Sequence, residues 1–137
     1  MATIQKQITL NVPAAAAWDA LRDVGALHTR LCPGFVTDTK LETDAAGKPV
    51  ARVVTFANGL VAREVIVTID DQAKRLAWSV VGGRMTHHNA SAQVFEEGPA
   101  QCRFVWIADL LPDELGPAIG KMIDAGLQAI RGALEAS

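Results

Sequence analysis

Residues 117–135 read PAIGKMIDAGLQAIRGALE, and the fold prediction depends on the pattern of these residues. Its large apolar side chains recur at intervals of three and four, which is the spacing of one buried helical stripe. The stripe consists of Ile119, Met122, Ile123, Leu127, Ile130 and Leu134. Proline opens the stretch, where its missing N–H costs a helix nothing. We therefore predict one long amphipathic helix over residues 117–135.

The region before this helix alternates apolar and polar residues with a period of two, which predicts strands. Turn signals divide it into six strands, at 35–42, 50–57, 60–70, 75–81, 86–95 and 101–110. Consecutive strands joined by short turns favour an antiparallel meander. Nearer the N-terminus, the pattern predicts a strand over 3–11, a helix over 13–23 and a second short helix over 26–31.

These elements predict an α+β fold. An antiparallel sheet with one apolar face can bury that face by curling around a single amphipathic helix. We expect a curved antiparallel sheet of seven strands wrapped around helix 117–135. Of the 137 residues, half are hydrophobic and 20% are charged, so we expect a single domain spanning residues 1–137.

Composition and charge argue against several functional classes. The 13 Lys and Arg residues against 15 Asp and Glu give a net charge of −2, with no basic stripe that would suit nucleic acid. No stretch approaches the ~20 apolar residues of a membrane span, and the first residues lack the apolar core of a signal peptide. We therefore expect a cytoplasmic protein with no integral membrane segment. The oligomeric state stays open, a homodimer included.

Strand alternation predicts which side chains face the helix. The inward set combines large aromatic rings with alanines: Phe35, Trp78, Phe104 and Trp106 beside Ala90, Ala92 and Ala108. The helix adds glycines at 120 and 126, each of which costs a helix roughly 1 kcal/mol relative to alanine. Such small residues permit either tight contact between helix and sheet or empty space, and composition leaves both explanations open.

Arg52 and Glu64 lie in the two strands of one hairpin, in otherwise apolar surroundings. If they face each other inside, they form a buried ion pair, which orients a ligand more readily than it stabilises a fold. The alternative is an exposed cross-strand pair worth under about 1 kcal/mol. A two-residue loop at Asn58-Gly59 would pair Val53 with Glu64 instead, so the spacing does not settle the register.

His87 and His88 suggest a metal site, but adjacent residues on a strand point to opposite faces and cannot hold one ion together. No HExxH, CxxC, GxGxxG or Walker sequence is present, so we expect no metal and no cofactor. His88 falls on the apolar side of its strand. It is either a hydrogen-bonded core residue or an acid–base group that titrates near neutral pH.

The order of elements resembles the START-like (SRPBCC) superfamily of helix-grip proteins, which includes Bet v 1-like and polyketide cyclase/dehydrase-like proteins and lipid-transfer domains. The supporting motifs are NVP at 11–13 before the helix with Trp18, and PGF at 33–35. The stretch REVIVTIDD at 63–71, continuing into WSVVGG at 78–83, is similar to the plant abscisic acid receptors of this superfamily. The resemblance covers essentially the whole chain.

This resemblance implies a ligand cavity between the sheet and the C-terminal helix, for which we expect roughly 300–1,000 Å³. It implies that Glu64 is a pocket carboxylate that holds water near the polar end of the ligand, with Arg52 as its partner, which requires a three-residue loop or a bulge in the hairpin. Pro33 stands where the receptors carry a pocket lysine, so their hormone is not the expected ligand. The ligand-binding candidates are Phe35, Arg52, Phe56, Glu64, Trp78, Val80, His88, Ala90, Ala92, Trp106, Met122 and Gly126.

We expect an intracellular protein that binds or transports a small hydrophobic molecule with one polar end. The alternative is a polyketide cyclase/aromatase-like enzyme in which Glu64, His88 and Arg52 are the candidate catalytic residues. A third hypothesis is an interaction protein with a vestigial cavity. Turnover of a bound molecule separates the first two.

Overall fold

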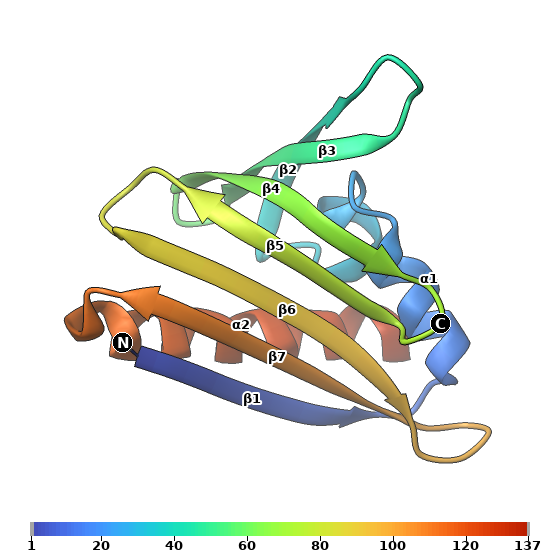
Figure 1. Ribbon diagram of the computed structural model, residues 1–137. Coiled ribbons are helices and arrows are strands. Elements are labelled where there is room, and N and C mark those ends of the chain that lie inside the picture. Colours follow the sequence, from blue (N-terminus) through green and yellow to red (C-terminus); the bar gives the residue numbers. More distant parts are fainter. Residues whose placement is uncertain (1, 137) are drawn as a thin grey trace.

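Seven antiparallel strands curve around one long helix in the computed structural model, which describes residues 2–136 (Figure 1). The strands are β1 (Ala2–Leu10), β2 (Val36–Thr43), β3 (Pro49–Phe56), β4 (Val61–Asp70), β5 (Arg75–Val81), β6 (His87–Glu96) and β7 (Cys102–Leu111). The helical segments are α1 (Ala14–Arg22), η1 (Leu27–Leu31), η2 (Asp113–Leu115) and α2 (Gly116–Glu135). The predicted strands and helices agree with these bounds to within one residue, and η1 is a single π-helical segment.

The strand order β1-β7-β6-β5-β4-β3-β2 confirms the helix-grip fold. After β1 the chain passes through α1 and η1 to the far edge of the sheet, and then returns strand by strand as the predicted meander. β1 pairs with β7, which places the first strand beside the last one. Helix α2 runs along the concave side of this curved sheet (Figure 1).

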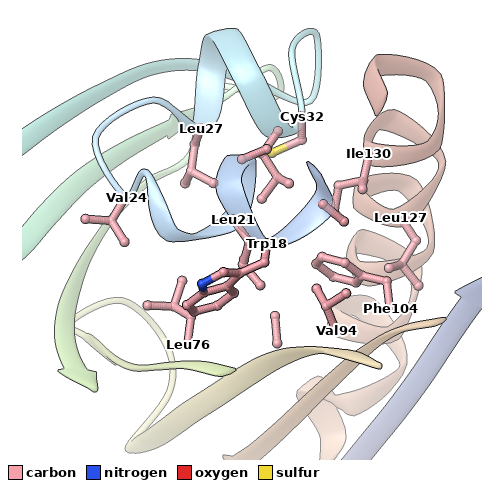
Figure 2. Close-up of a cluster of buried hydrophobic side chains, with 14 of the residues drawn as sticks. Trp18, Leu21, Val24, Leu27, Cys32, Leu76, Val94, Phe104, Leu127 and Ile130 are labelled. Atoms are coloured by element: carbon pink, nitrogen blue, oxygen red, sulfur yellow. The ribbon is translucent and has the colours of Figure 1, made fainter. Parts of the chain in front are cut away.

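The core lies between α2, α1 and the inner face of the sheet. Leu127 and Ile130 of α2 are buried and are directed toward Phe104 of β7 (Figure 2). Trp18 of α1 is also buried, and its Nε1 donates a hydrogen bond to Asp71 Oδ1 at 2.9 Å. This bond ties α1 to the turn between β4 and β5, so α1 closes one end of the sheet.

The hairpin between β3 and β4 has a three-residue loop. The Phe56 N–H donates to the Leu60 carbonyl at 2.8 Å, which leaves residues 57–59 as the loop. Gly59 has a φ of +91°, the left-handed conformation that commonly ends a three-residue hairpin loop. The register therefore pairs Arg52 with Glu64, as the resemblance implied and as a two-residue loop would not have done.

Candidate functional site

Arg52 and Glu64 form a buried ion pair on the inner face of the sheet. Arg52 Nε donates to Glu64 Oε1 at 2.8 Å, and the two side chains are only 2% and 9% exposed. Arg52 also donates from Nη1 to the Val24 carbonyl at 3.3 Å, and its guanidinium lies 5.4 Å from the centroid of the Trp78 ring. Arg52 is thus held by three partners. Among the described residues, Glu64 Oε2 has no hydrogen bond, so this oxygen is available to a bound molecule.

Two small cavities adjoin this pair: Glu64 lines both of them, and Arg52 lines only the first. The first is about 50 Å³ and extends toward α1 and η1, where Leu21, Leu27, Leu31 and Cys32 line it. The second is about 60 Å³ and lies near the start of α2. Its lining includes Val80, His88, Ala90, Ile119 and Met122. Each space has room for only a few water molecules, so the expected single cavity of 300–1,000 Å³ is wrong for this state of the protein.

Aromatic rings explain why the enclosed space is small. Phe35, Phe56, Trp78 and Trp106 border both cavities, as does Glu64. The Phe35 and Phe56 rings meet edge to face with centroids 5.4 Å apart, and the Trp78 and Trp106 rings do so at 6.1 Å. These four rings occupy the middle of the space between α2 and the sheet and divide it into two halves.

Gly126 was expected to line the ligand cavity, and the structure shows close contacts there instead. A Cβ atom at this position would lie 2.8 Å from the Trp106 ring and 3.1 Å from the Phe35 ring. Gly126 does not line either cavity; it lets the two rings pack directly against the backbone of α2. The glycine is therefore a site of tight contact, and the expectation of open space beside it is wrong.

His88 lines the second cavity together with Glu64. Its Nδ1 atom is buried and has no hydrogen-bond partner within residues 2–136. Burial lowers the pKa of His88 below its ordinary value of 6.5, and the neighbouring His87 lowers it further. The imidazole is accordingly mostly neutral at pH 7, and its Nδ1 is buried without a hydrogen-bond partner beside the cavity that the residue lines.

All the ligand-binding candidates except Gly126 line one cavity or the other. The sequence did not identify Leu21, Leu27, Leu31 and Cys32 as residues that line the first cavity. Leu27 and Leu31 are spaced by four residues, a signal too short to interpret in a five-residue segment. Cys32 is not a reactive thiol, because burial raises its pKa to about 12.

Membrane-spanning helices and metal-binding clusters are both absent from residues 2–136. No helix in this range is long and apolar enough to cross a membrane. In the same range, no group of three or more His, Cys, Asp or Glu side chains is arranged to hold a metal ion.

A family model described as polyketide cyclase / dehydrase and lipid transport matches residues 1–136. The chain belongs to this family. No curated protein gives a significant match to this chain.

Several solved structures have a similar fold and align with nearly the whole chain. A START superfamily protein from Mycobacterium smegmatis is 12% identical with a TM-score of 0.82, over 98% of this chain and 97% of that one. A protein from Thermobifida fusca is 28% identical with a TM-score of 0.77, over 98% and 96%. Norcoclaurine synthase from Thalictrum flavum, in complex with dopamine and hydroxybenzaldehyde, is 17% identical with a TM-score of 0.71, over 98% and 84%. At 12% and 17% identity, the likeness shows the fold alone.

Proposed function

We propose that this protein binds a small hydrophobic molecule with one polar end between the sheet and α2. The observation that carries the proposal is the buried Arg52–Glu64 pair, of which Glu64 lines both of the mostly apolar cavities. Desolvating two charges costs much of what their attraction returns, so such a pair adds little stability. Its position instead supports a role in orienting the polar group of a ligand.

A ligand larger than a few water molecules enters only if the aromatic rings between the cavities move. Phe35 and Phe56 are half-buried, so they are less constrained than the rest of the core. Phe35 follows Gly34, whose φ of +87° marks a turn in the segment before β2. In this proposal, displacement of the Phe35 and Phe56 rings joins the two cavities into one elongated site.

Native mass spectrometry of the freshly purified protein tests the proposal, with a co-purifying small molecule as the expected result. A second arm uses a matched pair of variants and the neutral fluorescent probe N-phenyl-1-naphthylamine. Ala90→Val places two methyl groups into the second cavity, whereas Ala77→Val adds them to the outer face of the adjacent strand. We expect Ala90→Val to weaken probe binding at least 10-fold and Ala77→Val to leave it unchanged. Absence of both a co-purifying molecule and probe binding would overturn the proposal.

One observation favours an enzyme as a second candidate function. The His88 side chain borders the same small cavity as Glu64, and its buried Nδ1 has no partner among the described residues, so the two side chains can act as acid and base on one substrate. This arrangement suits a cyclase- or dehydratase-like reaction on a hydrophobic polyketide. Incubation with a linear polyketide separates the candidates: an enzyme consumes it and loses this activity in a His88→Gln variant that still binds, whereas a carrier releases it unchanged.

A further inference from the structure

Glu64, Val80 and His88 are cross-strand neighbours on the inner face of the sheet. Glu64 of β4 pairs with Val80 of β5. His88 of β6 lies one position beyond the Ser79–Asn89 pair, which brings it level with Val80. Neighbouring strands are about 4.8 Å apart, so Glu64 and His88 are separated by about 10 Å with Val80 between them. A polar atom bound above Val80 is within reach of both side chains.

The charges around these three residues are already balanced. Arg52 is the one cationic side chain that lines either cavity within the described residues, and Glu64 neutralises it at 2.8 Å. The second cavity, where His88 lies, is lined by Glu64 but not by Arg52. An anionic group placed there would face the Glu64 carboxylate without a free cation, and burial would increase the cost of that repulsion.

We infer that the polar end of the ligand is a neutral hydroxyl, as in a phenol or an alcohol, rather than a carboxylate or phosphate; this inference rests on the proposed function. A hydroxyl donates one hydrogen bond and accepts others, so it matches both polar groups at once. It donates to Glu64 Oε2, and it accepts from His88 when the imidazole proton is on Nδ1 and the imidazole turns to bring this buried atom to the cavity. A ketone accepts but does not donate, so it leaves Glu64 Oε2 without a partner.

Three single-ring probes of similar size test this inference: p-cresol, toluene and p-toluate, titrated into the full chain at pH 7.5 and followed by NMR chemical shifts. We expect p-cresol to bind at least 10-fold more tightly than p-toluate and about 5-fold more tightly than toluene. Equal affinity for p-cresol and toluene, or tighter binding of p-toluate, would overturn the inference and leave the proposed hydrophobic site intact. Failure of all three probes to bind would overturn the proposed function itself.

Variants of the ion pair sharpen the test. Glu64→Gln leaves the Arg52 charge uncompensated, so we expect the preference to reverse in favour of p-toluate. The double variant Arg52→Met/Glu64→Leu removes both charges and covers the case in which Glu64→Gln does not fold. In it we expect toluene affinity to be kept and the ratio of p-cresol to toluene affinity to fall to about one. The matched control is Glu42→Gln, since Glu42 accepts hydrogen bonds from Arg63 on the exposed face and should leave all three affinities unchanged. A preference for p-cresol that survives in the double variant would contradict the inference.

Discussion

Two Arg–Glu pairs lie on opposite faces of the same part of the sheet. Inside, Arg52 Nε and Glu64 Oε1 are 2.8 Å apart, and the side chains are 2% and 9% exposed. Outside, Arg63 Nη2 and Glu42 Oε1 are 2.9 Å apart, and the side chains are 46% and 42% exposed. Arg63 and Glu64 are consecutive in β4, and the alternation of the strand alone sends them to different faces.

The two ion pairs differ in their hydrogen-bond geometry and in their exposure to solvent. The outer pair has the better geometry, because Arg63 makes two hydrogen bonds to the Glu42 carboxylate and thereby lowers the pKa of Glu42. Water and salt screen this pair, so it contributes little to stability. The inner pair has one such bond in an apolar setting, where loss of either partner leaves a buried charge alone. Although the N–O distances of the two pairs are nearly equal, loss of one partner should destabilise the protein far more in the inner pair than in the outer pair.

The largest predicted effect is that of Glu64→Leu. We expect it to lower the free energy of unfolding by about 3–5 kcal/mol, because it leaves the Arg52 charge buried without its partner. Adding Arg52→Met should restore stability to within about 1 kcal/mol of the wild type or above it. Urea denaturation measures both variants, with Glu42→Leu as the exposed control. A cost for Glu64→Leu as small as that of Glu42→Leu would remove the distinction between the two pairs.

Two glycines of α2 also differ in their surroundings: Gly126 faces the core, whereas Gly132 faces open space. Gly126→Ala drives a methyl group into the Trp106 and Phe35 rings, so we expect a net destabilisation of about 1–2 kcal/mol despite the better helix propensity of alanine. Gly132 has nothing within 4 Å of an added Cβ, so Gly132→Ala should stabilise by up to about 1 kcal/mol. Thermal unfolding of the two variants compares them. Equal stabilisation by both would show that the rings beside Gly126 yield easily.

The next effect in size is the pH dependence contributed by His88. Its pKa in the folded protein lies below 6.5, so the unfolded chain binds more protons between the two values. This contribution to stability is therefore complete above pH 6.5 and is lost as the pH falls through the folded-state pKa. We expect a smaller loss of stability between pH 7 and pH 5 in His88→Gln than in the wild type, measured by urea denaturation at each pH. An identical loss in both proteins would mean that His88 titrates as an exposed histidine does.

Salt should produce the smallest effect, and only on the outer pair. We expect the slight cost of Glu42→Gln to shrink between 0.05 M and 1 M NaCl, because exposed charges are screened at high ionic strength. The cost of Glu64→Gln should change little over the same range, since solvent ions do not reach the buried pair. Denaturation midpoints at the two salt concentrations measure both. A strong salt dependence of the Glu64→Gln cost would indicate that water enters the site freely.

The fold could be predicted from sequence because its signals are local and repeated. The apolar stripe of residues 119–134 and the alternation of the six meander strands each extend over many residues. The inward direction of His88 followed from the same alternation, and the structure places it at a cavity. Such patterns identify elements and faces without any knowledge of distant contacts.

The site could be predicted only in part, because its details depend on single contacts between distant segments. The motif Asn58-Gly59 fits both a two-residue and a three-residue loop, and only the second brings Arg52 opposite Glu64. Gly126 is compatible with open space or with close contact, and the positions of Trp106 and Phe35 decide the matter. The cavity volume depends on how four rings from distant segments of the chain pack, and no periodicity in the sequence encodes that packing.

The most direct test of the central claim is the affinity of the Arg52→Met/Glu64→Leu variant for p-cresol, measured by calorimetry beside the wild type and Glu42→Gln. If the buried pair orients the polar end of a ligand, the double variant keeps its free energy of unfolding and binds p-cresol about 5-fold more weakly. Glu42→Gln then binds as the wild type does. A stable double variant with unchanged affinity would contradict the account, because the inner pair would then matter no more to the ligand than the outer one.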